Sequence, residues 1–273
     1  YGIGVSGDVS INKLNETVLA FINDTGSFTT SGALSVQAQN DTSIYSISGS
    51  VAIAKTDPPK KSAGIAGSFS WIDLSGTTKA YMAGSATNNL DLAATGAVDV
   101  KASRSGKVLS ISAGGAGAKG SQTLTVAGSV SKNTITNTTA AYLQYVTGTA
   151  GSLKVTAQDT STIIANALSA GVSLADSTGG TGGSTIAVSV GISMALNQIN
   201  NTLSAYIAQS NITTLSTTAG IDITANASST ITATSVAAAI ASANGTSGGG
   251  TTFSFSGGGA LSINSILGNV SAY

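Results

Sequence analysis

The sequence predicts an all-β protein, a parallel β-helix or β-solenoid built from repeats of about 60 residues. Three observations support this: an internal repeat, stretches in which residue types alternate with period two, and only 8% charged residues with 34 Gly. Period two is typical of strands, and repeats too small to bury their own apolar faces are typical of stacked arrays. Stacked β-sandwich repeats are the alternative fold for the same pattern.

The repeat is marked by an alanine followed by an aromatic residue. The copies are Ala20-Phe21, Ala80-Tyr81, Ala141-Tyr142, Ala205-Tyr206 and Ala272-Tyr273. Successive aromatic residues are 60, 61, 64 and 67 positions apart. We expect one continuous array, a segment of a longer chain. The approximate units are residues 2–61, 62–120, 121–183, 184–250 and a partial unit, 251–273.

Two further features keep step with this anchor. An asparagine stands eight residues before the alanine in every copy but the second, which has Ile72 instead: Asn12, Asn133, Asn197 and Asn264. A short strand motif led by glycine follows the anchor, at residues 32–38, 96–102, 151–157 and 220–225. The predicted unit is therefore a long alternating strand, the Asn, a turn, the anchor strand, a turn, the Gly-led strand and a second long alternating strand.

Stacking equivalent positions predicts two side-chain ladders. One is an asparagine ladder of Asn12, Asn133, Asn197 and Asn264, and the other is an aromatic ladder of Phe21, Tyr81, Tyr142 and Tyr206. Such ladders satisfy side-chain amides and add ring contacts. The number of coils per repeat stays open at this point, because two or three shorter coils in each unit would separate these residues.

The alternating stretches have one small face and one apolar face. In residues 44–54, Ile47, Val51 and Ile53 share a face, while serines and alanines occupy the other. Faces of Gly, Ala and Ser let two sheets approach closely, and we expect stacked repeats to cover the apolar faces. The run 236–243 is alanine-rich and helix-like in isolation, but its place in the repeat predicts a strand.

Variable loops join the units, and the first of them is a candidate contact loop. It contains Asp57, Pro58, Pro59, Lys60 and Lys61, which include both prolines of the chain. Proline interrupts strand pairing, so the loop is expected to bulge outward. Its side chains can then blunt unwanted edge contacts or meet a partner.

Composition excludes several functions. Eleven basic and eleven acidic residues give no net charge, which predicts no nucleic-acid partner. The absence of cysteine removes disulfides and thiolate chemistry, and no apolar run is long enough for a transmembrane helix. We expect no cofactor, no metal and no catalytic residues, because the one Glu (Glu16), the one Arg (Arg104) and the scattered Asp read as solvated surface groups.

Strands of small residues ending in Asn, followed by a strand such as Thr138-Thr139-Ala140-Ala141-Tyr142, resemble the Gly/Ala/Ser/Thr/Asn-rich repeat regions of giant bacterial surface proteins. These are filamentous-haemagglutinin-like adhesins and autotransporter passengers. The resemblance covers the whole chain through composition more than through specific motifs. It implies a right-handed parallel β-helix, export to the cell surface or the extracellular space, and roles in adhesion or matrix building.

The predicted function is therefore a secreted, non-catalytic structural or adhesive segment that forms a rigid rod. Its partners would be adjacent repeats of the same chain, other copies of itself, and a cell-surface protein or glycan. One alternative is a self-assembling extracellular filament or sheath subunit joined end to end. Another is a carbohydrate-binding or carbohydrate-active β-helix, which would need exposed aromatics such as Trp71, the one tryptophan.

Overall fold

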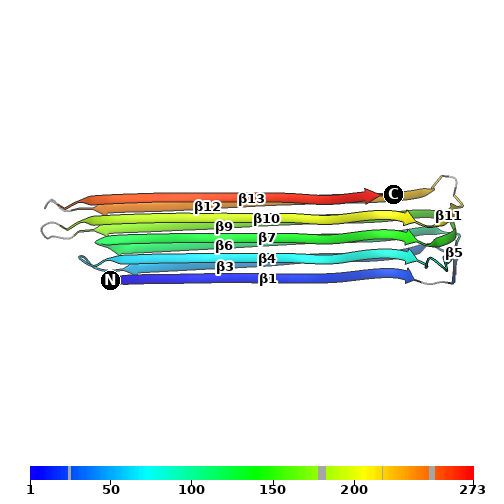
Figure 1. Cartoon of the computed structure of the whole chain (residues 1–273), viewed down its shortest axis with the longest axis horizontal. Coiled ribbons are helices and arrows are strands. Elements are labelled where there is room, and N and C mark those ends of the chain that lie inside the picture. Colours follow the sequence, from blue (N-terminus) through cyan, green and yellow to red (C-terminus); the bar gives the residue numbers. More distant parts are fainter. Residues whose placement is uncertain (24–25, 178–182, 217, 246–249) are drawn as a thin grey trace.

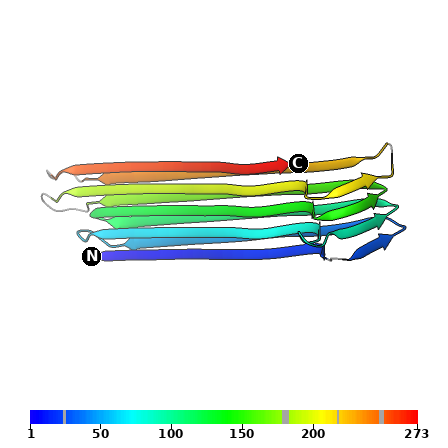
Figure 2. The ribbon, with the colours of Figure 1, turned by 45° about the vertical axis from the view of Figure 1, so that its right-hand side comes forward.

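The chain forms a flattened β-solenoid in which each repeat makes one coil (Figure 1). The computed structural model describes residues 1–23, 26–177, 183–216, 218–245 and 250–273. One long sheet lies in front and runs left to right, the chain returns behind it, and each coil rises above the previous one (Figures 1 and 2). This winding is right-handed, as is usual for connections between parallel strands.

Each complete coil consists of a long strand, a short strand and a second long strand. The first long strands are β1 (Gly2–Asn23), β4 (Ser62–Ala83), β7 (Gln122–Gln144), β10 (Thr185–Ala208) and β13 (Thr252–Ala272). The short strands are β2 (Ser27–Thr30), β5 (Leu90–Ala94), β8 (Val146–Ala150) and β11 (Asn211–Thr214). The returning long strands are β3 (Leu34–Lys55), β6 (Ala97–Gly120), β9 (Ser152–Asp176) and β12 (Ile221–Asn244).

Equivalent strands of successive coils pair in parallel and form three sheets. The front sheet has the order β1-β4-β7-β10-β13, the rear sheet β12-β9-β6-β3, and the short end sheet β11-β8-β5-β2. Register is unbroken, so Phe21 pairs with Tyr81, and Tyr81 with Tyr142. The spacing of the sequence repeat is thus the length of one coil, and the all-β solenoid prediction is confirmed.

The internal plan of the unit differs from the predicted one at three places, one of which is that the Gly-led strand and the second long strand form a single strand, such as β3 from residue 34 to residue 55. No turn separates Asn12 from Phe21, because β1 runs without interruption from residue 2 to residue 23. A short strand that the sequence pattern did not reveal closes the end of each coil. In the third and fourth coils the corner before the short strand contains a residue with a positive φ angle: Tyr145 at 55° and Gln209 at 51°. The helix-like run 236–243 lies within β12, as predicted.

Half of the solenoid is thin because glycines let the front and rear sheets touch. A Cβ on Gly114 would lie 2.2 Å from the carbonyl oxygen of Gly128, and one on Gly64 would lie 2.5 Å from that of Gly117. These distances are too short for any side chain. The prediction that small-residue faces allow close approach is confirmed in this half.

Serines fill the space between the two sheets in the thin half. Ser110 lies 2.9 Å from Ser70 and 2.8 Å from Ser131, and all three are fully buried. Ser68 and Ser112 are 2.8 Å apart in the same way. The hydroxyls satisfy one another across the interface, which removes the cost of burying them alone.

The apolar residues of the thin half point outward, which corrects the expectation that stacking would cover them. Ile47 and Ile53 on β3 are 76% and 75% exposed, and Ile3 on β1 is 74% exposed. The physical reason is that coils stack through strand edges, so stacking covers backbone groups and leaves the sheet faces open. Only the interface between the two sheets can bury a face, and here the small residues occupy it.

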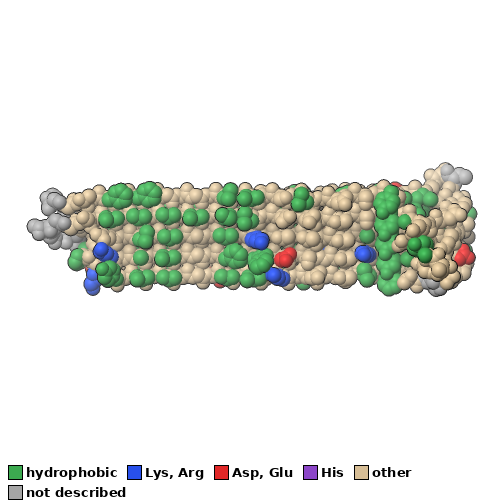
Figure 3. Space-filling view, in the orientation of Figure 1, with side chains coloured by type: hydrophobic (Ala, Val, Ile, Leu, Met, Phe, Trp, Pro, Cys, Tyr) green, Lys and Arg blue, Asp and Glu red, His purple; other side chains and the backbone are tan. Residues whose placement is uncertain are grey.

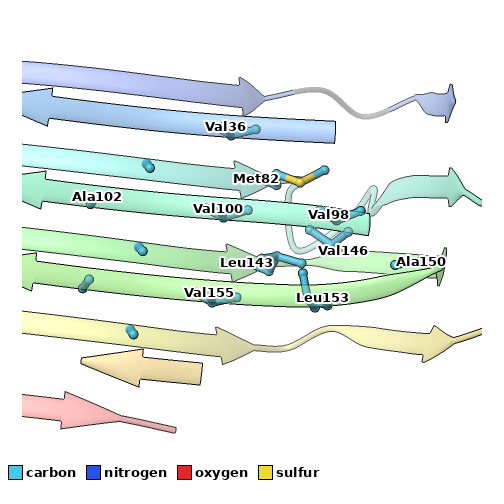
Figure 4. Packing of buried hydrophobic residues seen from close by; sticks show 14 of the residues in the cluster. Val36, Met82, Val98, Val100, Ala102, Leu143, Val146, Ala150, Leu153 and Val155 are labelled. Carbon is cyan, nitrogen blue, oxygen red and sulfur yellow. The ribbon is translucent and has the colours of Figure 1, made fainter. Parts of the chain in front are cut away.

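The other half of the solenoid is thicker and has a conventional apolar core beside the short end sheet (Figure 4). Met82 and Leu143 from the front sheet meet Val100 and Val155 from the rear sheet, with Val146 contributed by β8. All five side chains are fully buried. Burial of a Val, Leu or Met side chain contributes about 1.5–3 kcal/mol.

The close sheet contact predicts which glycines tolerate a methyl group. Gly114→Ala forces the added carbon against the carbonyl of Gly128, so we expect a loss of about 1–3 kcal/mol in the free energy of unfolding. Gly67→Ala is the matched control, because nothing lies within 4 Å of its added Cβ, and its stability is expected to stay equal or rise slightly. Urea denaturation followed by circular dichroism measures both. Equal midpoints for the two variants would contradict the close approach.

Candidate functional site

The aromatic anchors form a continuous stack along the solenoid. Ring centroids are 5.2 Å apart for Phe21 and Tyr81, 4.9 Å for Tyr81 and Tyr142, 4.9 Å for Tyr142 and Tyr206, and 5.3 Å for Tyr206 and Tyr273. The rings are almost parallel, with interplanar angles from 0° to 10°. This separation is close to the distance between neighbouring strands, so the backbone register sets the ring spacing.

The stack hides the ring faces of its inner members. Each of Tyr81, Tyr142 and Tyr206 has an aromatic neighbour on both sides, so only ring edges point to solvent. A sugar stacks on a ring face, and the inner rings offer none. Burial raises the pKa of Tyr142 to about 12, with smaller contributions from Tyr206 and Tyr81. The ladder therefore works as a structural seam along the edge of the thick half.

The asparagines form a ladder over part of their length. The side-chain amide of Asn133 donates to Asn197 at 2.8 Å, and that of Asn197 donates to Asn264 at 2.9 Å. Asn12 is separated from these three by Ile72, which pairs with both Asn12 and Asn133. Asn12 instead donates to Ser10 at 3.1 Å. The structure thus brings three of the four together and leaves Asn12 two coils away from Asn133, with Ile72 between them.

A buried charged cluster lies between the serine rows and the apolar core. Arg104 is 1% exposed, and its guanidinium is 3.9 Å from the carboxylate of Glu16. Gly76 makes room for it, since a Cβ there would lie 2.5 Å from one guanidinium nitrogen. Among the described residues, no hydrogen bond to the guanidinium is found. The guanidinium is thus held mainly by its attraction to the carboxylates of Glu16 and Asp159. Burial lowers the pKa of Arg104, and these two carboxylates raise it.

Asp159 faces the same cluster from the next coil and is 1% exposed. Its carboxylate accepts hydrogen bonds from four side chains: Ser161 at 2.7 Å, Asn201 at 2.7 Å, Thr139 at 3.3 Å and Asn137 at 3.4 Å. Burial raises the pKa of Asp159, and the hydrogen bonds from Ser161, Thr139 and Asn137, together with Arg104, oppose that rise. Asp159 therefore ties the front sheet to the rear sheet.

Glu16 is the outer member of the cluster. Its carboxylate accepts hydrogen bonds from Thr42 and, at 2.9 Å, from Asn40. The Thr42 hydrogen bond is the largest influence on the pKa of Glu16, which is lowered, with Asn40 and Arg104 acting in the same direction against burial. Glu16, Arg104 and Asp159 were expected to be solvated; Arg104 and Asp159 are buried and Glu16 is half-buried, which corrects that expectation. The alternation of neighbouring residues was the available signal, since Arg104 shares its inward face with Ala102 and Val108.

Trp71 lies on the outer face of the front sheet with a lysine over its ring on two sides. The ammonium of Lys13 is 4.4 Å from the ring centroid, and that of Lys132 is 5.1 Å away. Cation–π contacts of this kind contribute about 0.5–1 kcal/mol at exposed sites. The ring is therefore engaged within the chain, and a sugar stacking on it would have to displace a lysine.

The contact loop lies at the end of the thin half, and its backbone is tied down. The carbonyl of Lys60 accepts a hydrogen bond from the amide of Ser121 at 2.9 Å, and that of Lys61 accepts one from the amide of Gly2 at 2.9 Å. The side chains of Asp57, Lys60 and Lys61 are exposed. The loop thus bridges neighbouring coils and presents its charges to solvent. Residues 178–182 and 246–249, in the variable loops between β9 and β10 and between β12 and β13, lie outside the described residues.

The most extensive candidate surface is the outer face of the thin half on the front sheet, visible as rows of apolar side chains in Figure 3. We call it the front panel. It consists of the outward residues of β1 from Ile3 to Val9 and their register partners on β4, β7, β10 and β13. Every position carries an apolar residue or glycine. The rear sheet has a smaller apolar face, which we call the rear panel: the outward residues Gly49, Val51 and Ile53 of β3 and their register partners on β6, β9 and β12.

Comparison with known proteins found no match, so the class of this molecule is defined by its structure. No family model matches the chain, and no curated protein or solved structure matches it either. Among the described residues, no group of three or more His, Cys, Asp or Glu is placed to hold a metal ion. No helix in the described part of the chain is long and apolar enough to cross a membrane. The molecule is a right-handed β-solenoid with one coil per repeat.

The aromatic stack predicts a graded loss of stability. Tyr142→Ala removes two ring contacts, and we expect a loss of about 2–4 kcal/mol in the free energy of unfolding. Phe21→Ala at the end of the stack removes one contact and is expected to cost about half as much. Tyr142→Phe keeps the stack and serves as the control. Thermal and urea denaturation test the order, and an equal cost at Phe21 and Tyr142 would argue against a cooperative seam.

The two carboxyl groups of the cluster predict opposite pH dependences. The pKa of Asp159 is raised above 3.8, so stability falls as pH rises from the unfolded pKa through the folded one, and Asp159→Asn should abolish this fall. The pKa of Glu16 is lowered below 4.5, so its contribution is present above that pH and is lost on acidification; Glu16→Gln should abolish that loss. Urea midpoints from about pH 3 to pH 8 measure both slopes. A profile of Asp159→Asn parallel to that of the parent would refute the burial of this carboxyl.

Proposed function

We propose that this chain is an extracellular structural and adhesive segment that acts as a rigid, non-catalytic solenoid. The observation that carries the proposal is the unbroken register of equivalent residues through successive coils, which includes the aromatic stack and the asparagine ladder. In such an array each coil is stabilised by its neighbours, so length can be extended by adding repeats. That property suits a protein that spans distance.

The placement of the charged residues supports a structural role. Glu16, Arg104 and Asp159 are the inward-facing members of a cluster that joins the two sheets. On the outer surface, the ammonium groups of Lys13 and Lys132 contact the ring of Trp71. The groups that could have suggested acid–base chemistry thus have partners that explain them as parts of the fold.

Adhesion would follow from repetition rather than from a single deep site. The outer surface presents the same type of side chain at a spacing of about 4.8 Å from coil to coil. Weak contacts at this spacing add up, because once one contact forms the others become intramolecular. A cell-surface protein or glycan with its own repeating structure is the matching type of partner.

The proposal is tested on cells that produce the protein. Intact cells are treated with an extracellular protease, and the chain is followed with an antibody; we expect it to be lost from intact cells. Beads coated with the purified chain at high and low density are then presented to cell surfaces, and retention should rise more steeply than density. Protection of the chain inside intact cells would overturn the extracellular role, and retention strictly proportional to density would overturn adhesion by avidity.

A filament or sheath subunit is a second candidate, favoured by the open strands at the two ends of the stack. Among the described residues, β1 pairs only with β4 and β13 only with β10, so each has a free hydrogen-bonding edge. Phe21 and Tyr273 also have one ring face without an aromatic neighbour in the described part of the chain. Electron micrographs of the purified chain distinguish the two functions. Ordered filaments with coils in register favour the subunit, and dispersed particles favour the spacer.

A further inference from the structure

The front panel is an exposed apolar surface that the fold itself does not use. Val5 and Val9 are 72% and 65% exposed on β1, and Phe255 is 52% exposed at the other end of the sheet. The 20 outward positions of the panel include no charged or hydrogen-bonding side chain. Contiguous apolar patches of several hundred Å² on soluble proteins usually mark an interaction site.

The size of the panel matches one half of a protein interface. Four columns of side chains about 6.8 Å apart and five strands about 4.8 Å apart give about 650 Å² for each copy, from the standard spacings of strands. Two copies packed face to face would bury about 1,300 Å², which lies within the range of specific interfaces. Each further coil would enlarge this area.

The surface of the panel is uneven as well as apolar. One column consists of Gly7, Gly67, Gly128, Ile192 and Gly259, and it forms a furrow that only Ile192 interrupts. It lies between two ridges, one with Val5, Ile65, Val126 and Val190 and the other with Val9, Phe69, Val130, Met194 and Leu261. In Figure 3 the furrow is a column without side chains except on one strand, where an apolar side chain fills it. Unlike the inward glycines, Gly67, Gly128 and Gly259 have nothing within 4 Å of an added Cβ. The fold of one chain therefore does not require glycine there.

We propose that the front panel binds the front panel of a second copy of this chain, with the ridge of each copy seated in the furrow of the other. A two-fold axis parallel to the solenoid axis, between the furrow and the ridge that contains Val5, brings these columns together in both directions and sets the column of Ile3 against the column of Val9. Glycine in a strand often marks a place where another chain approaches closely. The front sheet is also nearly flat (Figure 1), and flat sheets are usually stabilised by stacking or by side-chain ladders.

A second copy fits this surface better than a glycan or a lipid bilayer. A glycan needs hydrogen-bonding groups, and the panel offers none along its outward side chains. The chain has no net charge, so two copies approach without repulsion and an anionic lipid surface has no electrostatic attraction for it. Face-to-face pairing is also distinct from end-to-end assembly, because it leaves the edges of β1 and β13 free.

The test uses the whole chain and three substitutions. Ile65→Glu places a charge on the ridge beside the furrow, and Gly128→Leu fills the furrow without a clash inside the chain. Both are expected to weaken self-association at least 10-fold in sedimentation equilibrium. Thr77→Glu is the matched control, because it lies on the outer face of the same strand, β4, in the other half of the molecule. It should leave the dissociation constant within about 2-fold of the parent. Circular dichroism verifies that all variants keep their strands.

Several results would overturn the proposal. The parent chain should dimerise below about 100 µM, so a monomer at that concentration contradicts it. Val51→Glu on the rear panel should leave dimerisation unchanged; loss of the dimer in this variant, with the dimer of Ile65→Glu intact, would move the interface to the rear sheet. Binding of the monomeric parent to phosphatidylcholine vesicles, abolished by Ile65→Glu, would assign the panel to a lipid surface instead.

Discussion

Parallel pairing of equivalent residues between successive coils is the constraint on which the rest of the structure depends. It places each residue one strand spacing from its counterpart, so every side chain meets a relative of itself above and below. Aromatic and amide side chains gain from this arrangement, as the stack at Tyr142 and the ladder at Asn197 illustrate. Like charges placed directly opposite each other are destabilising, and Lys55 with Lys119 is one such pair that the chain carries. The low charge content follows from this repetition, and Arg104 lies in register between Asn40 and Asp159 rather than beside another cation.

The same constraint explains why the two halves of the coil are built differently. Stacking satisfies the backbone, and only the facing of the two sheets can bury side chains. In the thick half, Met82 and Val100 fill that space in the usual way. In the thin half, Gly114 and Ser110 allow the sheets to touch, and the apolar side chains are displaced to the outside. A surface of this kind suits a molecule that packs laterally against other molecules.

Much of the fold could be predicted from the sequence, because repetition and alternation both report on backbone geometry. The Ala-Tyr anchors fixed the length of the unit, and period two identified the long strands. Which face points inward could not be predicted, since a period of two is the same for either face. The signal that was missed lay in the pairing of small residues on facing strands, such as Gly64 with Gly117. The buried cluster was not predicted for a related reason: Arg104 and Asp159 come together only when successive coils stack. The short strands are too brief, with β2 only four residues long, to show a pattern.

The central claim is that one repeat makes one coil, and a cysteine pair tests it most directly because the chain has no cysteine of its own. Ser105 on β6 pairs in register with Thr160 on β9, and both point outward. Paired positions in neighbouring strands lie within the Cα separation of about 4.4–6.8 Å that a disulfide requires. The doubly substituted chain Ser105→Cys/Thr160→Cys should form an intramolecular disulfide on mild oxidation, whereas Ser103→Cys/Thr160→Cys, offset by two residues, should form far less. Equal yields from the two pairs, or no disulfide in either, would contradict the account.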